Sequence, residues 1–132
     1  MEEEMRVRRA IKLAEKEYKE NVNRARELAE LGAQLEEAAK EGRSFGRDES
    51  KKLERVEKLA KKIRTEAGGS DEDTLLNNPP GKLESALARL AEVSESLYKS
   101  VEKTPRQVIS AAVIEKANVI LQLTRLARNL FH

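Results

Sequence analysis

Side chains able to carry out covalent or proton-transfer chemistry are scarce in this sequence. Its 132 residues include no cysteine and a single histidine, His132. Thiol nucleophiles, zinc ribbons and iron–sulfur centres all depend on cysteine. A histidine general base would have to be His132, at the end of the sequence, and chain ends are poorly ordered in most domains. We therefore expect neither cysteine chemistry nor histidine acid–base catalysis.

The other templates for catalysis or ligand binding each lack a required residue. Gly81-Lys82 has no glycine at the position that a phosphate-binding loop requires. Neither Tyr18 nor Tyr98 is followed four residues later by lysine, so a tyrosine–lysine proton-transfer pair is missing. The acidic run 71–73 lacks the further ligands and the glycine of a calcium loop. We expect a protein that is not an enzyme and that holds no metal and no cofactor.

One regular arrangement of charged side chains stands out, in the second helical segment. This basic stripe consists of Lys51, Arg55, Lys58 and Lys62. Steps of four, three and four residues place these cations on one side of an α-helix, where they could bind phosphates. No aromatic side chain lies among them for base stacking. The solvated face of a bundle helix is the simpler interpretation, and nucleic-acid binding is the alternative.

Apolar residues recur with helical spacing along most of the chain. In the first segment they are Val7, Ile11, Ala14, Tyr18, Val22, Ala25 and Ala29. Their steps of three and four residues average close to the 3.6 of an α-helix, and no segment shows the alternation of a β-strand. The spacing predicts helices over about 2–41, 48–67, 80–102 and 105–130, with a linker over 68–81.

Local signals mark the predicted helix ends. Asp48 is suited to cap the second helix, and Gly68-Gly69 to end it. The fourth helix has two candidate starts. One is Thr104 as the N-cap, followed by Pro105 and Gln107, and the other is Ser110 as the N-cap. The sequence does not decide between them. Phe45, which lies between two glycines, is expected to plug the end of the helical bundle.

These elements predict an all-α fold. Four amphipathic helices with short connectors favour a single domain over 1–132, a four-helix up-and-down bundle with an elongated first helix. The fourth segment is apolar around much of its circumference, so we expect it to be the central helix.

The first segment is longer than such a bundle can cover. At 1.5 Å per residue it would extend roughly 60 Å, against roughly 30–40 Å for the others. Gly32 could mark a break that folds the segment back, a kink or a close helix–helix contact, and the sequence leaves these alternatives open. An unbroken helix would project its apolar stripe into water, which favours a partner helix.

We therefore expect a non-enzymatic protein–protein interaction or assembly module. It would bind a protein partner or associate with itself through the first helix, in a coiled-coil-like homo-oligomer. The expected interface residues are Val7, Ile11, Tyr18 and Val22. The alternative is a nucleic-acid-associated accessory protein that uses the basic stripe as an anion-binding surface.

Membrane association and secretion are not expected. No apolar run approaches the roughly 20 residues of a membrane span. Met1-Glu2-Glu3-Glu4 does not resemble the basic start of a secretory signal, and the absence of cysteine, which excludes disulfides, fits a cytosolic chain. We expect a cytoplasmic protein.

Overall fold

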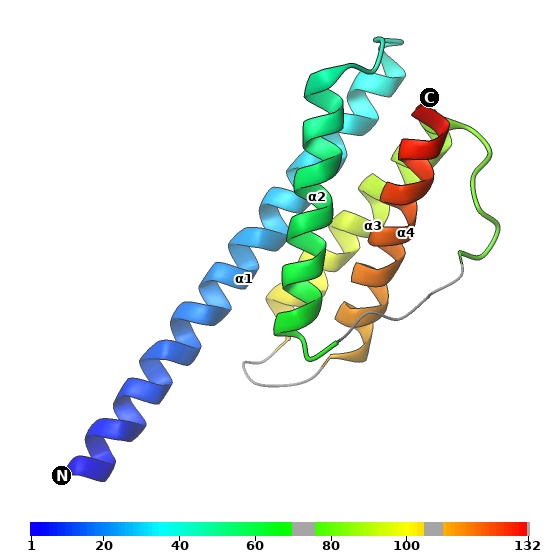
Figure 1. Cartoon of the computed structure of the whole chain (residues 1–132). Coiled ribbons are helices and arrows are strands. Elements are labelled where there is room, and N and C mark those ends of the chain that lie inside the picture. Colours follow the sequence, from blue (N-terminus) through cyan, green and yellow to red (C-terminus); the bar gives the residue numbers. More distant parts are fainter. Residues whose placement is uncertain (70–75, 105–109, 132) are drawn as a thin grey trace.

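The chain is helical over most of the residues that the computed structural model describes, which are 1–69, 76–104 and 110–131. Helix α1 spans Glu2–Lys40, α2 spans Arg47–Glu66, α3 spans Leu83–Lys103 and α4 spans Ala111–Phe131. These ranges contain no strand. The helices pack as a bundle from which α1 extends (Figure 1). The prediction of an all-α four-helix bundle with an elongated first helix is confirmed.

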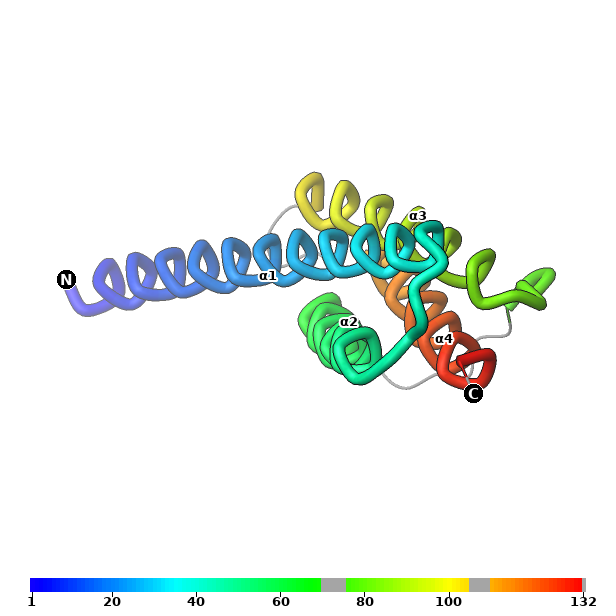
Figure 2. Tube along the Cα trace, turned by 90° about the horizontal axis from the view of Figure 1, so that it is seen from above, coloured from blue at the N-terminus to red at the C-terminus, as the bar shows by residue number. Residues whose placement is uncertain are grey.

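Each helix packs against two neighbours, and the contacting pairs are antiparallel. Helix α1 contacts α2 and α3, and α4 contacts the same two helices from the opposite corner (Figure 2). Arg64 near the end of α2 bonds Asn118 in α4, and Lys116 of α4 bonds Ser100 near the end of α3. Helices α2 and α3 therefore run in the same direction, and the end of α2 and the start of α3 lie at opposite ends of the bundle (Figure 1). If every connector had been short, successive helices would have alternated in direction along the chain.

The core is a continuous seam of aliphatic side chains. The predicted apolar face of α2 is buried, at Leu53, Val56, Ala60 and Ile63. The prediction that α4 is central is wrong, because the described backbone of α4 lies beside α2 and α3 and not beside α1, at the corner of the bundle diagonal to α1. Its wide apolar surface is divided between α2 and α3, and positions such as Ile114 and Val119 pack at the margin of the core.

The end of α2 is the Schellman motif that Gly68-Gly69 predicts. The Gly68 N–H donates to the Thr65 carbonyl at 3.1 Å, and the Gly69 N–H to the Arg64 carbonyl at 2.9 Å. Gly68 has a φ of 90°, a conformation that glycine adopts at no steric cost. A Cβ atom on Gly69 would lie 2.9 Å from Ile114 Cγ2, so this glycine also lets α2 meet α4.

The start of α2 differs from the prediction. Gly46 is the N-cap, and its N–H donates to the Glu49 carboxylate at 3.2 Å, so Asp48 lies in the first turn and not at the cap. Backbone N–H groups of Glu49 itself and of Gly46 lower the pKa of the Glu49 carboxyl. Phe45 packs edge-on against Phe131, with ring centroids 5.4 Å apart, which confirms the predicted plug.

The described start of α4 favours the second of its two candidate caps. The Ser110 hydroxyl accepts a hydrogen bond from the Val113 N–H at 3.2 Å. The Thr104 hydroxyl instead donates to a carbonyl in the last turn of α3. The proposed signal at Pro105 and Gln107 lies outside the described residues.

Helix α1 runs without a break through Gly32, and its N-terminal half extends beyond the bundle (Figures 1 and 2). A Cβ atom on Gly32 would lie 3.3 Å from Ala91 Cα and 3.3 Å from Ser94 Oγ, both in α3. Of the three alternatives for this glycine, the structure therefore shows the close helix–helix contact. Because the helix does not fold back, its N-terminal end lies beyond the described residues of the other three helices.

Candidate functional site

The N-terminal part of α1 is the most unusual surface of the described structure, and we call its residues 2–17 the arm. Helix α3, which covers one side of α1 inside the bundle, ends at Lys103. At that level the Tyr18 hydroxyl donates to the Glu102 carbonyl. Within the arm only Ala14 is partly buried. The arm is about 24 Å of helix that extends past the end of α3 (Figure 1).

The structure divides the four predicted interface residues into two groups. Val7 and Ile11 lie on the arm, with 57% and 48% of their surfaces exposed. Tyr18 bonds the end of α3, and Val22 packs against the core. Val7 and Ile11 are therefore the members of the set that remain open to a partner.

The apolar stripe of the arm continues the side of α1 that faces α3. Eighteen residues make five full helical turns, so residues eighteen apart point in the same direction. Ile11 is thus aligned with Ala29, and Ala14 with Gly32, and both of these α1 residues lie against α3 or at its edge. Val7 is aligned in the same way with Ala25, which is fully buried. The arm repeats a helix-packing surface at a place where α3 has ended.

The basic stripe of α2 is exposed, and acidic neighbours neutralise most of it. Arg55 donates two hydrogen bonds to the Glu27 carboxylate of α1, at 2.6 and 3.0 Å, and this lowers the pKa of Glu27. Lys58 and Lys62 lie 3.7 and 3.2 Å from glutamates one turn away. Lys51 makes no ion pair within the described ranges. The four cations share one face, but three of them have carboxylate partners.

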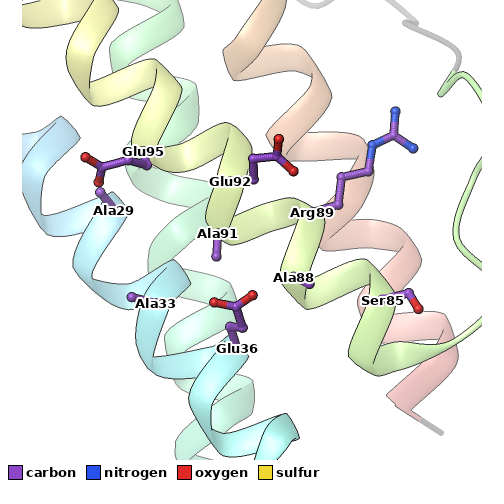
Figure 3. Close-up of a pocket in the computed structure, with 9 residues that line it drawn as sticks. All are labelled: Ala29, Ala33, Glu36, Ser85, Ala88, Arg89, Ala91, Glu92 and Glu95. Atoms are coloured by element: carbon purple, nitrogen blue, oxygen red, sulfur yellow. The ribbon is translucent and has the colours of Figure 1, made fainter.

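A shallow groove of about 670 Å³ lies between α1 and α3 (Figure 3). Small side chains, among them Ala33 and Ala88, line it, and Glu36 and Glu92 project from its two sides. Arg89 also lines the groove, and its guanidinium donates to the backbone carbonyls of residues 77 and 78. Over the described ranges, no cluster of three or more potential ligands could hold a metal ion. The groove offers methyl groups and separated carboxylates, and no nucleophile with an adjacent base.

Sequence reasoning missed a buried polar contact between α2 and α4. Arg64 Nη1 donates to Asn118 Oδ1 at 3.1 Å, and the two residues are 6% and 3% exposed. The one available signal was the position of Asn118 between Ala117 and Val119 in a strongly apolar segment. This contact fixes the register of two helices and is a structural feature of the core.

Comparisons with protein-family models, with curated proteins and with solved structures give no match. The structure itself describes a four-helix bundle with a projecting helical arm. Within the described residues, no helix combines the length and the apolar character needed to cross a membrane.

Proposed function

We propose that this protein is a non-enzymatic assembly module that associates with itself through the arm of α1. The observation that carries this proposal is the exposure of large apolar side chains on an unsupported helix. The exposed large apolar side chains of the arm are Met5, Val7, Ile11 and Leu13. Among the residues that the structure describes, the exposed large hydrophobic side chains are these four and Met1.

The energetics of helix packing support this proposal. Most helical stability in proteins comes from the packing of an apolar face. The arm has such a face at Val7 and Ile11, but its own bundle does not cover it. A partner helix on this face would remove apolar surface from water, at roughly 25 cal/mol per Å².

Nucleic-acid binding has less support. The carboxylates beside Arg55, Lys58 and Lys62 would compete with phosphates for the same cations. Fewer counterions would then be released on binding, which reduces the electrostatic gain. The stripe also has no aromatic side chain for base stacking.

Light scattering on the full chain and two arm variants tests the proposal. Ile11→Asp places a charge in the stripe, whereas Leu13→Asp places the same charge about 200° around the helix. Leu13 is 56% exposed and Ile11 48%, so the two substitutions are closely matched. We expect Ile11→Asp to shift the protein towards monomer and Leu13→Asp to have a much smaller effect. A monodisperse monomer at high micromolar concentration, unchanged by Ile11→Asp, would contradict the proposal.

A further inference from the structure

We infer that the arm of one copy of this chain docks in the groove between α1 and α3 of a second copy. This inference rests on the proposed self-association and names the surface that receives the arm. It follows from the rigidity of α1, from the length and lining of the groove, and from the arrangement of charges on the two surfaces.

The groove cannot hold the arm of its own chain. One wall of the groove is α1 itself, at Ala29, Ala33 and Glu36. Helix α1 is unbroken from Glu2 to Lys40, so the arm points away from the groove along the same axis (Figures 1 and 2). An arm that occupies the groove therefore belongs to another copy. Such a contact is head-to-tail, so a joined pair still offers one arm and one groove, and further copies can add.

The groove matches the arm in length and in the size of its side chains. Its α3 wall extends from Ser85 to Glu95, about 15 Å of helix, and residues 5–14 of the arm extend about 14 Å. Alanines line both walls (Figure 3), at Ala29, Ala33, Ala88 and Ala91. These methyl groups leave space for larger side chains of a second helix to fit between them. Val7 and Ile11, one turn apart on the arm, are the side chains that we expect there.

The charges beside the stripe of the arm complement those on the α3 wall. Arg8 and Lys12 are one turn apart and lie about 60° and 100° around the helix from Ile11, on the same flank. Glu92 and Glu95 are about one turn apart on the α3 wall (Figure 3). Within the described residues, none of these four charged side chains has an ion pair. Two unpaired cations can therefore meet two unpaired carboxylates.

The ends of these two rows also have opposite charges. On the arm, Glu4 and Glu15 lie about one turn beyond the two cations, and on α3, Arg89 and Lys99 lie about one turn beyond the two carboxylates. The arm thus has the order acid, base, base, acid, and the α3 wall has the reverse. Glu15 already interacts within its own chain, and Arg89 bonds two backbone carbonyls. The match therefore depends on the two central pairs, and the ends add no repulsion.

The α1 side of the groove is acidic in the middle and basic at its ends. Between residues 26 and 40, the charged residues within about 60° of Ala33 around the helix are Arg26, Glu30, Glu36, Glu37 and Lys40. The flank of the arm that would face them has Glu3 and Glu17 at its ends and Ala10 between them. Glu3 and Glu17 are fourteen residues, or about 21 Å, apart, as are Arg26 and Lys40. Both cations already have partners, so they contribute less than the central pairs.

Mixing two variants tests the docking directly, because each copy supplies one arm and one groove. Ile11→Asp disables the arm, whereas Ala33→Arg fills the groove from an exposed position. We expect each variant alone to be monomeric by sedimentation velocity, and an equimolar mixture to form a one-to-one dimer. Gln34→Arg is the matched control, since residue 34 is exposed and does not line the groove. This variant should associate as the natural chain does.

Charge exchange provides a second test that leaves the apolar contacts unchanged. Arg8→Glu/Lys12→Glu and Glu92→Arg/Glu95→Arg should each weaken association about tenfold, because each replaces attractive contacts with repulsive ones. A chain that carries all four substitutions should regain most of the affinity. Arg9→Glu/Lys16→Glu makes the same change of charge at positions about 160° and 140° from Ile11, and it should leave the affinity within about twofold.

The outcomes separate the groove from the proposed function. If the natural chain associates and Ala33→Arg associates equally well, the groove is not the acceptor. A mixture with Ile11→Asp that stays monomeric, or a fourfold charge variant without recovery, overturns the docking in the same way. A natural chain that remains monomeric at high micromolar concentration overturns both the docking and the proposed self-association.

Discussion

Gly32 of α1 lies against the backbone of α3 at Ala91, and a Cβ atom on this glycine would be 3.3 Å from Ala91 Cα. This contact holds the middle of α1 close to α3, while Tyr18 bonds the end of α3 further towards the N-terminus. Two attachments along one side keep α1 straight where it leaves the bundle. The direction of the arm is therefore set by contacts inside the bundle.

Gly32→Val should lower the free energy of unfolding by about 1–3 kcal/mol, measured by urea denaturation. The clash is with a backbone atom of Ala91, which cannot rotate away. Gly81→Val is the control, because nothing lies within 4 Å of a Cβ atom built there. Equal stability of the two variants would show that α1 and α3 have room to separate.

Asn118→Leu should destabilise the protein by about 1–3 kcal/mol, because it removes the acceptor from a buried guanidinium hydrogen bond. Asn23 provides a matched comparison, since it accepts from Arg26 at 2.9 Å in an exposed arginine–asparagine pair. We expect Asn23→Leu to change the free energy of unfolding by less than about 0.5 kcal/mol. Similar losses in both variants would contradict the structural role assigned to the Arg64–Asn118 contact.

The ion pair between Arg55 and Glu27 predicts a pH dependence. The hydrogen bond from Arg55 lowers the pKa of Glu27 below its ordinary 4.5 in the folded state. The unfolded chain therefore takes up this proton first as the pH falls, so the stabilisation is complete above pH 4.5 and is lost below it. Urea midpoints from pH 7 to pH 3 should fall less steeply for Glu27→Gln than for the natural chain. Identical slopes would mean that this pair contributes nothing.

The basic stripe should not shift duplex DNA in a low-salt mobility assay at micromolar protein. Its cations at 55, 58 and 62 already have carboxylate partners within 4.0 Å. A salt-sensitive shift that Lys58→Glu removes would contradict this expectation and favour the nucleic-acid alternative.

Local patterns in the sequence predicted the elements well, because they depend on neighbouring residues. The period of Leu53, Val56, Ala60 and Ile63 identified the buried face of α2, and Gly68-Gly69 identified its end. Asp48 was predicted as the cap of α2 because aspartate is a favoured N-cap residue. The N-cap is instead Gly46, whose backbone N–H bonds the Glu49 carboxylate.

Relationships between distant helices could not be obtained in this way. The shared direction of α2 and α3 depends on where the connection between them ends, and its turn-rich composition does not encode that position. The corner position of α4 was missed because a wide apolar surface is compatible with two positions in a bundle. A helix with such a surface can lie at the centre, or it can lie at a corner and pack against two neighbours. The contact of Arg64 with Asn118 joins positions 54 residues apart and depends on the register of two antiparallel helices.

Sedimentation equilibrium of the full chain, beside a chain that begins at residue 18, tests most directly whether the arm causes assembly. We expect the mass of the full chain to rise with concentration from 14.9 kDa towards the dimer. The shortened chain should stay monomeric and unfold at nearly the same temperature, because the side chains of the arm, apart from Ala14, are exposed. A full chain that remains at monomer mass to high micromolar concentration, or a shortened chain that associates equally, would contradict the proposal.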